Sequence, residues 1–247
     1  MIKIQNIYDN DDFFKKYKAI RENDQGFNNL IEQPAILSLL PELKDKVILE
    51  IGCGFGNFAR YAIEQGATSV FAVDPSSNML NEAQKNTQHA QITFRQTAVE
   101  DLECESSSFD LVVSSVAFHY VKDFDLLVKH IAAWLKPQGQ LIFSVEHPIC
   151  TAYPAAVIKT DEHGVMFHPV YNYRDETMFE QHWLVDSVQK YHRRVSTYIN
   201  TLLANGFSLE HILEPMPDDA LIVKRTEFSV HKIRPPLLMV KGRKIVP

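Results

Sequence analysis

Glu50-Ile51-Gly52-Cys53-Gly54-Phe55-Gly56-Asn57 is the stretch that decides the fold. The residues just before it, 47–51, form a nearly all-apolar run, which is typical of a strand buried on both faces of a parallel sheet. The glycines that follow allow the backbone to approach a ligand closely. A helical pattern begins at about Asn57 and ends near Gly66, because glycine commonly follows the last turn of a helix. We therefore expect a strand, a ligand-binding turn and a helix.

Strands alternate with helices on both sides of this unit. The apolar runs and helical periodicities predict strands at 69–73, 92–94, 109–114, 140–145, 209–213 and 237–240, and helices at 11–23, 35–40, 76–86, 124–135 and 195–205. This alternation predicts an α/β fold with a doubly wound, mostly parallel sheet and helices on both faces. Between 147 and about 192 the alternation stops and aromatic residues and histidines accumulate, so we interpret this stretch as a cap over the carboxyl edge of the sheet.

Length and composition suit one α/β domain spanning residues 1–247, with an N-terminal helical lid at 1–44. The net charge of -6 and the lack of a basic stripe argue against nucleic acid as a partner. No apolar run is long enough for a membrane span, and no signal peptide is recognisable. Three scattered cysteines and histidines without H-x-x-x-H spacing predict neither disulfides nor a metal site, and favour the reducing cytoplasm.

Asp74 ends the second predicted strand, 20 residues after Gly54. An acid at this place can accept hydrogen bonds from both hydroxyls of a ribose, and the turn and the acid together indicate a bound nucleoside. A dinucleotide fingerprint requires G-x-G-x-x-G, but here Asn57 takes the third position and the glycine falls one residue early, at Gly56. This spacing favours a nucleoside without a pyrophosphate.

The same turn resembles the first motif of the class I, seven-stranded methyltransferases that depend on S-adenosylmethionine (SAM). The resemblance continues through Asp74, 98–102, 109–115 and 135–141, and 143–148 with 190–193 resemble a bacterial subgroup that acts on small molecules. It implies the strand order 3-2-1-4-5-7-6, with the last strand antiparallel. It also implies SAM as the methyl donor, S-adenosylhomocysteine as the product, and a small-molecule acceptor.

Cofactor contacts follow from the resemblance residue by residue. Gly52 and Gly54, with Cys53 between them, are expected beneath the amino-acid end of SAM, Asp74 at the ribose and Met79 near the adenine; Pro75 is a further cofactor-binding candidate. Relatives often carry an acid at the position of Ala98, which cannot supply one; the backbone N–H of Val99 and the side chain of Glu100 are the alternatives. Ser114 is expected to line the methionine part, and Tyr17 and Arg21 to fold over the cofactor, with Arg21 pairing with its carboxylate.

Methyl transfer mainly requires the alignment of an acceptor with an already activated methyl group. A general base helps when the acceptor is a hydroxyl and is dispensable for a neutral amine. We identify His147, His119 and Tyr191 as the candidate catalytic residues, with His147 first because it directly follows a predicted strand. Pro148 leaves a second interpretation open, in which His147 belongs to a structural turn. The aromatic cap favours an apolar or planar acceptor, although its rings can equally form the cap's own core.

Four functions remain in competition on the sequence alone. A methyltransferase acting on N or O of a small metabolite is the first. The others are a nicotinamide-dependent oxidoreductase, a non-catalytic SAM-binding protein and a macromolecular methyltransferase. The displaced glycine argues against the second, and the acidic balance argues against RNA or DNA as the substrate of the fourth. Monomer and homodimer are both compatible with the sequence.

Overall fold

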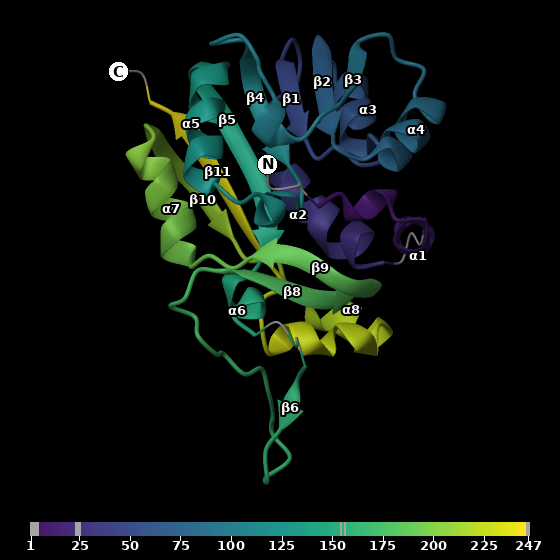
Figure 1. Ribbon diagram of the computed structural model, residues 1–247, viewed down its shortest axis with the longest axis vertical. Helices are drawn as coiled ribbons and strands as arrows, with labels where there is room; N and C mark the ends of the chain where they lie inside the picture. Colours follow the sequence, from purple (N-terminus) through teal and green to yellow (C-terminus); the bar gives the residue numbers. More distant parts are fainter. Residues whose placement is uncertain (1–4, 23–25, 154, 156, 246–247) are drawn as a thin grey trace.

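The computed structural model describes residues 5–22, 26–153, 155 and 157–245, and Figure 1 shows its arrangement. A seven-stranded sheet organises the chain, in the order β10-β11-β5-β4-β1-β2-β3. Numbered along the chain as seven strands, this is the expected order 3-2-1-4-5-7-6. The last strand, β11, runs antiparallel to both of its neighbours, and the other pairings are parallel. The predicted fold class is therefore confirmed.

The strands of this sheet lie close to their predicted positions. Their bounds are β1 Val47–Ile51, β2 Ser69–Asp74, β3 Ile92–Gln96, β4 Phe109–Ser114, β5 Leu135–Glu146, β10 Phe207–Leu213 and β11 Leu237–Lys244. The largest difference is in β5, which begins five residues before the predicted start at 140. A register shift against β4 interrupts its pairing, and Gln138 has a positive φ of 64° there. The sequence did not predict this irregular beginning of β5, because Pro137 and Gly139 are both typical of turns.

Two apolar layers sandwich the sheet, because successive residues of a strand point to opposite faces. Leu49 packs on one face with residues of α5 (Phe124–Trp134) and α7 (Val195–Ala204). Ile48 packs on the other face with residues of α2 (Gln33–Ser38), α3 (Asn57–Glu64) and α4 (Ser77–Lys85). Both side chains are fully buried. The central strands are thus covered on both faces, as the all-apolar run 47–51 predicted.

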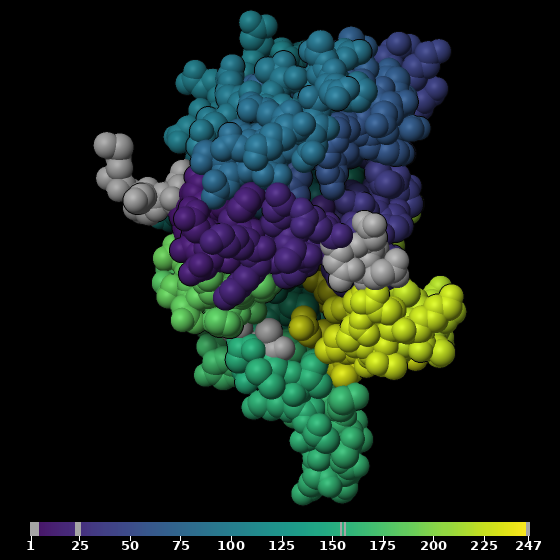
Figure 2. Space-filling model, turned by 90° about the vertical axis from the view of Figure 1, so that its right-hand side faces the viewer, coloured from purple at the N-terminus to yellow at the C-terminus, as the bar shows by residue number. Residues whose placement is uncertain are grey.

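The N-terminal segment holds α1 (Asp11–Arg21) between two short helical turns, η1 (Ile7–Asp9) and η2 (Asn28–Glu32). Asn23, where we expected the first helix to end, lies outside the described residues. Figure 2 shows this segment, in purple, between the part of the molecule that carries β1–β3 and the green and yellow parts of the chain. Within the described residues, none of the helices combines the length and apolarity that crossing a bilayer requires.

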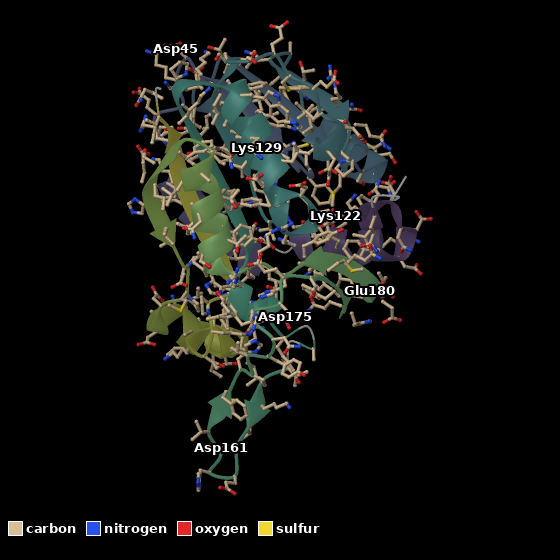
Figure 3. All side chains as sticks on the ribbon, turned by 60° about the vertical axis from the view of Figure 1, so that its left-hand side comes forward. Asp45, Lys122, Lys129, Asp161, Asp175 and Glu180 are labelled. Atoms are coloured by element: carbon tan, nitrogen blue, oxygen red, sulfur yellow. The ribbon has the colours of Figure 1, made fainter. Side chains whose placement is uncertain are left out.

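Residues 147–192 contain two hairpins that occupy different positions relative to the sheet. After α6 (Pro148–Thr151), the small hairpin of β6 (Lys159–Thr160) and β7 (Met166–Phe167) projects away from the sheet, with Asp161 near its tip (Figures 1 and 3). The second hairpin, β8 (Met178–Trp183) and β9 (Val185–Tyr191), lies beneath the carboxyl edge of the sheet. Only the second hairpin therefore takes the position expected of a cap.

Residues 214–236 contain helices that periodicity did not predict. They comprise α8 (Asp219–Lys224) and the 3-10 stretch η5 (Thr226–Lys232), with short helical turns elsewhere at η3 (Val99–Asp101) and η4 (Phe118–Tyr120). Ile222 and Phe228 bury their side chains against Ile31 of η2 in a small separate cluster. This contact brings the C-terminal helices next to the N-terminal segment, beside the edge of the sheet where β11 begins.

Candidate functional site

A cavity of about 590 Å³ opens at the carboxyl edge of the sheet. Its volume lies within the range of about 300–1,000 Å³ that is common for small-molecule sites. The turn after β1, the ends of β2 and β4, the N-terminal segment, the β8–β9 hairpin and the approach to β11 all contribute to its lining. The site is thus built where ligands bind in open α/β sheets.

Glycine is required in the turn after β1 by its backbone conformation. Gly52, Gly54 and Gly56 have φ angles of 74°, 52° and 69°, a region that side-chain-bearing residues rarely adopt. The backbone N–H groups of Gly52 and Cys53 both donate to the carbonyl of Val73, at 2.8 and 3.0 Å. These bonds attach the turn to β2, so that residues 52–55 form one wall of the cavity.

Asp74 stands opposite this turn and is almost completely buried. Its Oδ2 accepts the backbone N–H of Gly54 and its Oδ1 accepts that of Ser76, both at 2.9 Å. Burial raises the pKa of the carboxyl to about 6, although the two backbone hydrogen bonds act in the opposite direction. Each oxygen retains accepting capacity, because a carboxylate offers about four lone-pair sites. Asp74 lines the cavity and can therefore accept hydrogen bonds from a ribose diol.

Glu50, at the end of β1, is a second buried acid of the cavity wall. Burial, followed by the negative charge of Asp74, raises its pKa to about 8. Its Oε2 has no hydrogen-bond partner among the described residues. Buried polar atoms are normally paired, and an orphaned one facing a cavity calls for a bound partner. A polar ligand lying over the turn would provide the hydrogen-bond partner that this oxygen lacks.

The side expected to receive the adenine is lined by Pro75, Met79, Val99 and Glu100. The Met79 side chain is almost completely buried, and its helix is capped by Ser76, whose hydroxyl accepts the N–H of Met79 at 3.1 Å. Burial raises the pKa of Glu100. Both alternatives to the acid missing at position 98, the Val99 backbone and the Glu100 side chain, thus lie at the cavity wall.

Tyr17 and Arg21 also line the cavity, on the inner side of α1. The ring of Tyr17 packs against Trp183 of the β8–β9 hairpin, with 6.0 Å between their centroids. The Lys16 ammonium donates to the carbonyl of Leu184 at 2.8 Å, which attaches the same helix to the tip of the hairpin. Helix α1 and β8–β9 therefore close over the cavity together.

Polar groups near the ends of β4 and β5 line another part of the cavity, and β1 separates these strands from β2, which ends at Asp74. Glu146 accepts a hydrogen bond from the Lys190 ammonium at 2.7 Å, and the Lys190 side chain is nearly completely buried. The Nδ1 atom of His119 accepts the backbone N–H of Glu146 at 3.4 Å, which leaves the proton of a neutral imidazole on Nε2. Burial holds the pKa of His119 well below its ordinary value. His119 is thus a neutral hydrogen-bond donor, and Tyr120 lies beside it in the lining.

Three of the predicted site residues are not placed at the cavity. His147, our first choice for a base, caps α6: its Nδ1 accepts the N–H of Ile149 at 3.1 Å and its Nε2 lies 2.8 Å from Glu214. Both ring nitrogens are therefore in use, and the turn interpretation is the one the structure supports. Tyr191 packs beside the Arg193 guanidinium. Ser114 points inward and donates to the carbonyl of Ile51 at 2.9 Å.

Other residues at the cavity were not among those predicted from the sequence. Ser115, one residue after the predicted Ser114, lines the cavity and donates to Glu32 at 2.6 Å. Ser144 donates to the same Glu32 oxygen at 3.2 Å, and burial raises the pKa of this carboxyl. Glu32 comes from a short π-helical turn far from the sheet in sequence, so no spacing rule links it to β4. The one sequence feature that could have indicated Glu32 is its acidic side chain within the apolar periodicity of residues 27–37.

SAM fits this arrangement of residues. Asp74 offers acceptors for a diol, the turn offers a close backbone wall, and the unpartnered Glu50 oxygen requires a polar neighbour. A methyl group built on Gly54 would meet nothing within 4 Å, so the space over the turn is open.

Comparisons with known proteins show what the chain is similar to. Residues 49–143 match the family model described as "Methyltransferase domain". The crystal structure of an S-adenosylmethionine-dependent methyltransferase from Mesorhizobium loti superimposes with a TM-score of 0.82, at 38% identity, over 86% of this chain and 97% of that one. A protein of Haemophilus influenzae without an assigned function is 37% identical over 97% of both chains.

The match to curated enzymes of known reaction is shorter. Malonyl-[acyl-carrier protein] O-methyltransferase of a Paenibacillus species is 36% identical over 107 residues, which cover 41% of this chain and 39% of that enzyme. The matched part is thus less than half of either chain. Together with the strand order and the full-length match to the Mesorhizobium loti structure, these similarities show that the chain belongs to the class I, seven-stranded family of SAM-dependent methyltransferases.

Proposed function

We propose that this protein transfers the methyl group of SAM to a nitrogen or oxygen atom of a small-molecule acceptor. The observation that carries the proposal is that one cavity joins two different walls. The glycine-rich turn and Asp74 form the first, and His119, Tyr120 and Glu146 form the second. A donor over the first wall would direct its methyl group toward an acceptor at the second.

The cofactor, when bound, supplies an activated methyl group on a sulfonium. The protein's own contribution is then to bind, align and exclude water. We assign Asp74 to the ribose hydroxyls, the turn at 52–54 to the amino-acid end and Arg21 to its carboxylate. Met79, Pro75, Val99 and Glu100 are assigned to the adenine side. The lid formed by η1, α1 and the β8–β9 hairpin would hold both reactants away from solvent.

His119 replaces His147 in our proposal for the acceptor wall. Because its imidazole stays neutral with the proton on Nε2, His119 would orient the acceptor by donating a hydrogen bond. Burial raises the pKa of Tyr120 far above its ordinary value, so the phenol would also act as a neutral hydrogen-bonding group. Neither residue is suited to remove a proton at neutral pH, and this favours an acceptor that reacts without a strong base, such as a neutral amine.

A methyl-transfer screen tests the proposal. The purified protein is incubated with a metabolite extract and SAM carrying a trideuterated methyl group, and products are sought by mass spectrometry. We expect a labelled small molecule that is absent with Asp74→Asn and present with Asp175→Asn, a matched substitution of an exposed residue outside the cavity (Figure 3). Tight S-adenosylhomocysteine binding without any labelled product would favour a non-catalytic SAM-binding protein. Labelling confined to protein in the extract would favour a macromolecular substrate.

A further inference from the structure

Arg234 is a cationic residue of the cavity that has no anionic partner among the described residues. It lies between η5 and β11 and lines the cavity. Its Nη1 donates to the sulfur of Cys150, and its Nε is enclosed without any hydrogen-bond partner. Among the residues that the structure describes, no carboxylate forms a salt bridge with it. Within the described part of the chain, the Nε side of the guanidinium therefore has no hydrogen-bond partner.

The described acids near Arg234 make their hydrogen bonds to other residues, and the nearby thiol is uncharged. Glu146 is paired with Lys190, and Glu214 is bonded to His147. The Cys150 thiol is neutral at physiological pH, because burial raises its pKa to about 11. A partly buried guanidinium without a counter-charge is costly, whereas its planar fork binds carboxylates and phosphates well. A carboxylate or phosphate of a ligand is thus the group that suits this guanidinium best.

His231, three residues before Arg234, adds a second unpartnered group to the same end of the cavity. Its Nδ1 is buried and has no hydrogen-bond partner in the described chain. Its ring lies 5.1 Å from that of Phe27, centroid to centroid. Burial and the charge of Arg234 lower its pKa to about 4, so the imidazole is neutral and carries one N–H. The aromatic ring of Phe27 therefore lies next to His231, and both His231 and Arg234 have polar atoms that a ligand could bind.

Arg234 and His231 lie far from the proposed ribose site, because they precede a different strand of the sheet. Asp74 ends β2, whereas Arg234 precedes β11, and β1, β4 and β5 lie between these two strands. Four inter-strand steps of about 4.8 Å place the two strands roughly 19 Å apart. The first residue of β11, Leu237, pairs with Glu146 of the acceptor wall. Arg234 is therefore on the acceptor's side of the cavity.

We propose that Arg234 binds an anionic group of the methyl acceptor, a carboxylate or a phosphate, and that His231 hydrogen-bonds to the same group. This inference rests on the proposed function and narrows it to acidic small molecules. The anion is held at the end of the cavity nearest β11, and the atom that receives the methyl group lies toward His119 and Tyr120. Phe27 provides an apolar surface for the part of the acceptor next to the anion.

Binding of simple aromatic anions tests this subsite. The protein is saturated with S-adenosylhomocysteine, and the dissociation constants of benzoate, phenyl phosphate and the uncharged benzamide are measured by ligand-observed NMR. We expect at least one of the anions to bind at least about tenfold more tightly than benzamide, as charge-assisted hydrogen bonds allow. The preferred anion distinguishes a carboxylate-bearing from a phosphate-bearing acceptor. Equal affinity for the three probes would overturn the proposal.

Substitutions assign the effect to Arg234. Arg234→Gln should abolish the preference for anions, and Arg234→Lys should retain part of it. Lys232→Gln, a change at an exposed lysine outside the cavity, should leave it intact. S-adenosylhomocysteine affinity is measured in the same variants and should not change. If Arg234→Gln lost that affinity, Arg234 would belong to the cofactor site. If wild type bound no S-adenosylhomocysteine at all, the proposed function itself would fail.

Discussion

The carboxylate of Asp74 accepts the backbone N–H of Gly54 at 2.9 Å, which connects the acid at the end of β2 to the turn after β1. The two features that indicated a nucleoside in the sequence are thus in direct contact. The acid contributes to the position of the turn even before a ligand binds. Asp74 therefore has two roles in our account, as a support for the turn and as the acceptor of the ribose hydroxyls.

Replacement of Asp74 should reduce the affinity for the cofactor far more than it reduces the stability of the fold. Asp74→Asn keeps the size of the side chain but removes its charge and offers one accepting oxygen instead of two. We expect S-adenosylhomocysteine affinity to fall by about 100-fold, since hydrogen bonds to charged groups contribute about 1.5–3 kcal/mol each. Isothermal titration calorimetry measures the loss, with Asp175→Asn as the control. An affinity within threefold of wild type would remove Asp74 from the site.

Cofactor affinity should depend on pH through the same carboxyl. Its pKa of about 6 in the free protein means that the acid gains a proton as the pH falls below 6, and the protonated form accepts fewer hydrogen bonds. Affinity should thus decrease as the pH falls from 7 to 5. Glu50, with its pKa of about 8, stays protonated throughout this range. Calorimetry at several pH values should show the slope in wild type and none in Asp74→Asn; a slope that persists in the variant would assign it to another group.

Alanine substitutions in the turn should separate folding from binding. A Cβ at Gly52 would lie 2.7 Å from the Cβ of Ala117, whereas one at Gly54 would meet nothing within 4 Å. Both positions have a positive φ, which costs an alanine roughly 1–2 kcal/mol. Gly52→Ala should lose a further ~1–3 kcal/mol of stability through overpacking. Gly54→Ala should lose no more than the backbone cost, yet bind S-adenosylhomocysteine at least tenfold more weakly, because its methyl group enters the open space over the turn. Urea unfolding and calorimetry measure the two effects, and equal stability of both variants would contradict the geometry.

His147 should matter for stability and not for the cofactor. Its side chain accepts the N–H of Ile149 at the beginning of α6. Loss of such a cap costs about 0.5–2 kcal/mol. His147→Ala should therefore lower the free energy of unfolding by about that amount and leave the affinity for S-adenosylhomocysteine unchanged. Once an acceptor is known, His119→Ala should reduce the rate of methyl transfer more than His147→Ala; the reverse order would restore His147 as the candidate catalytic residue.

The sheet and the cofactor wall could be predicted because their signals are local. Buried strands such as Val47–Ile51 are continuous apolar runs, and a glycine-rich turn with an acid at the next strand end has a fixed spacing. Several other residues of the cavity had no such signal. Glu32, Lys190 and Arg234 come from distant parts of the chain, and only the tertiary fold brings them to one cavity.

His147 and Ser114 show a second limit of sequence reasoning. His147 follows an expected strand and Ser114 ends one, so the positions of their backbones in the fold were predicted. The direction of each side chain, however, depends on which neighbour satisfies its hydrogen bonds. Ser114 donates to Ile51 across the sheet, and His147 turns back onto α6. One residue farther along the chain, Ser115 faces the cavity instead.

A crystal structure of the protein with S-adenosylhomocysteine tests the central claim most directly. We predict that the ribose hydroxyls lie within hydrogen-bonding distance of the Asp74 carboxylate and that the homocysteine part passes over residues 52–56. A ligand bound elsewhere, or with its sugar directed away from Asp74, would contradict the account.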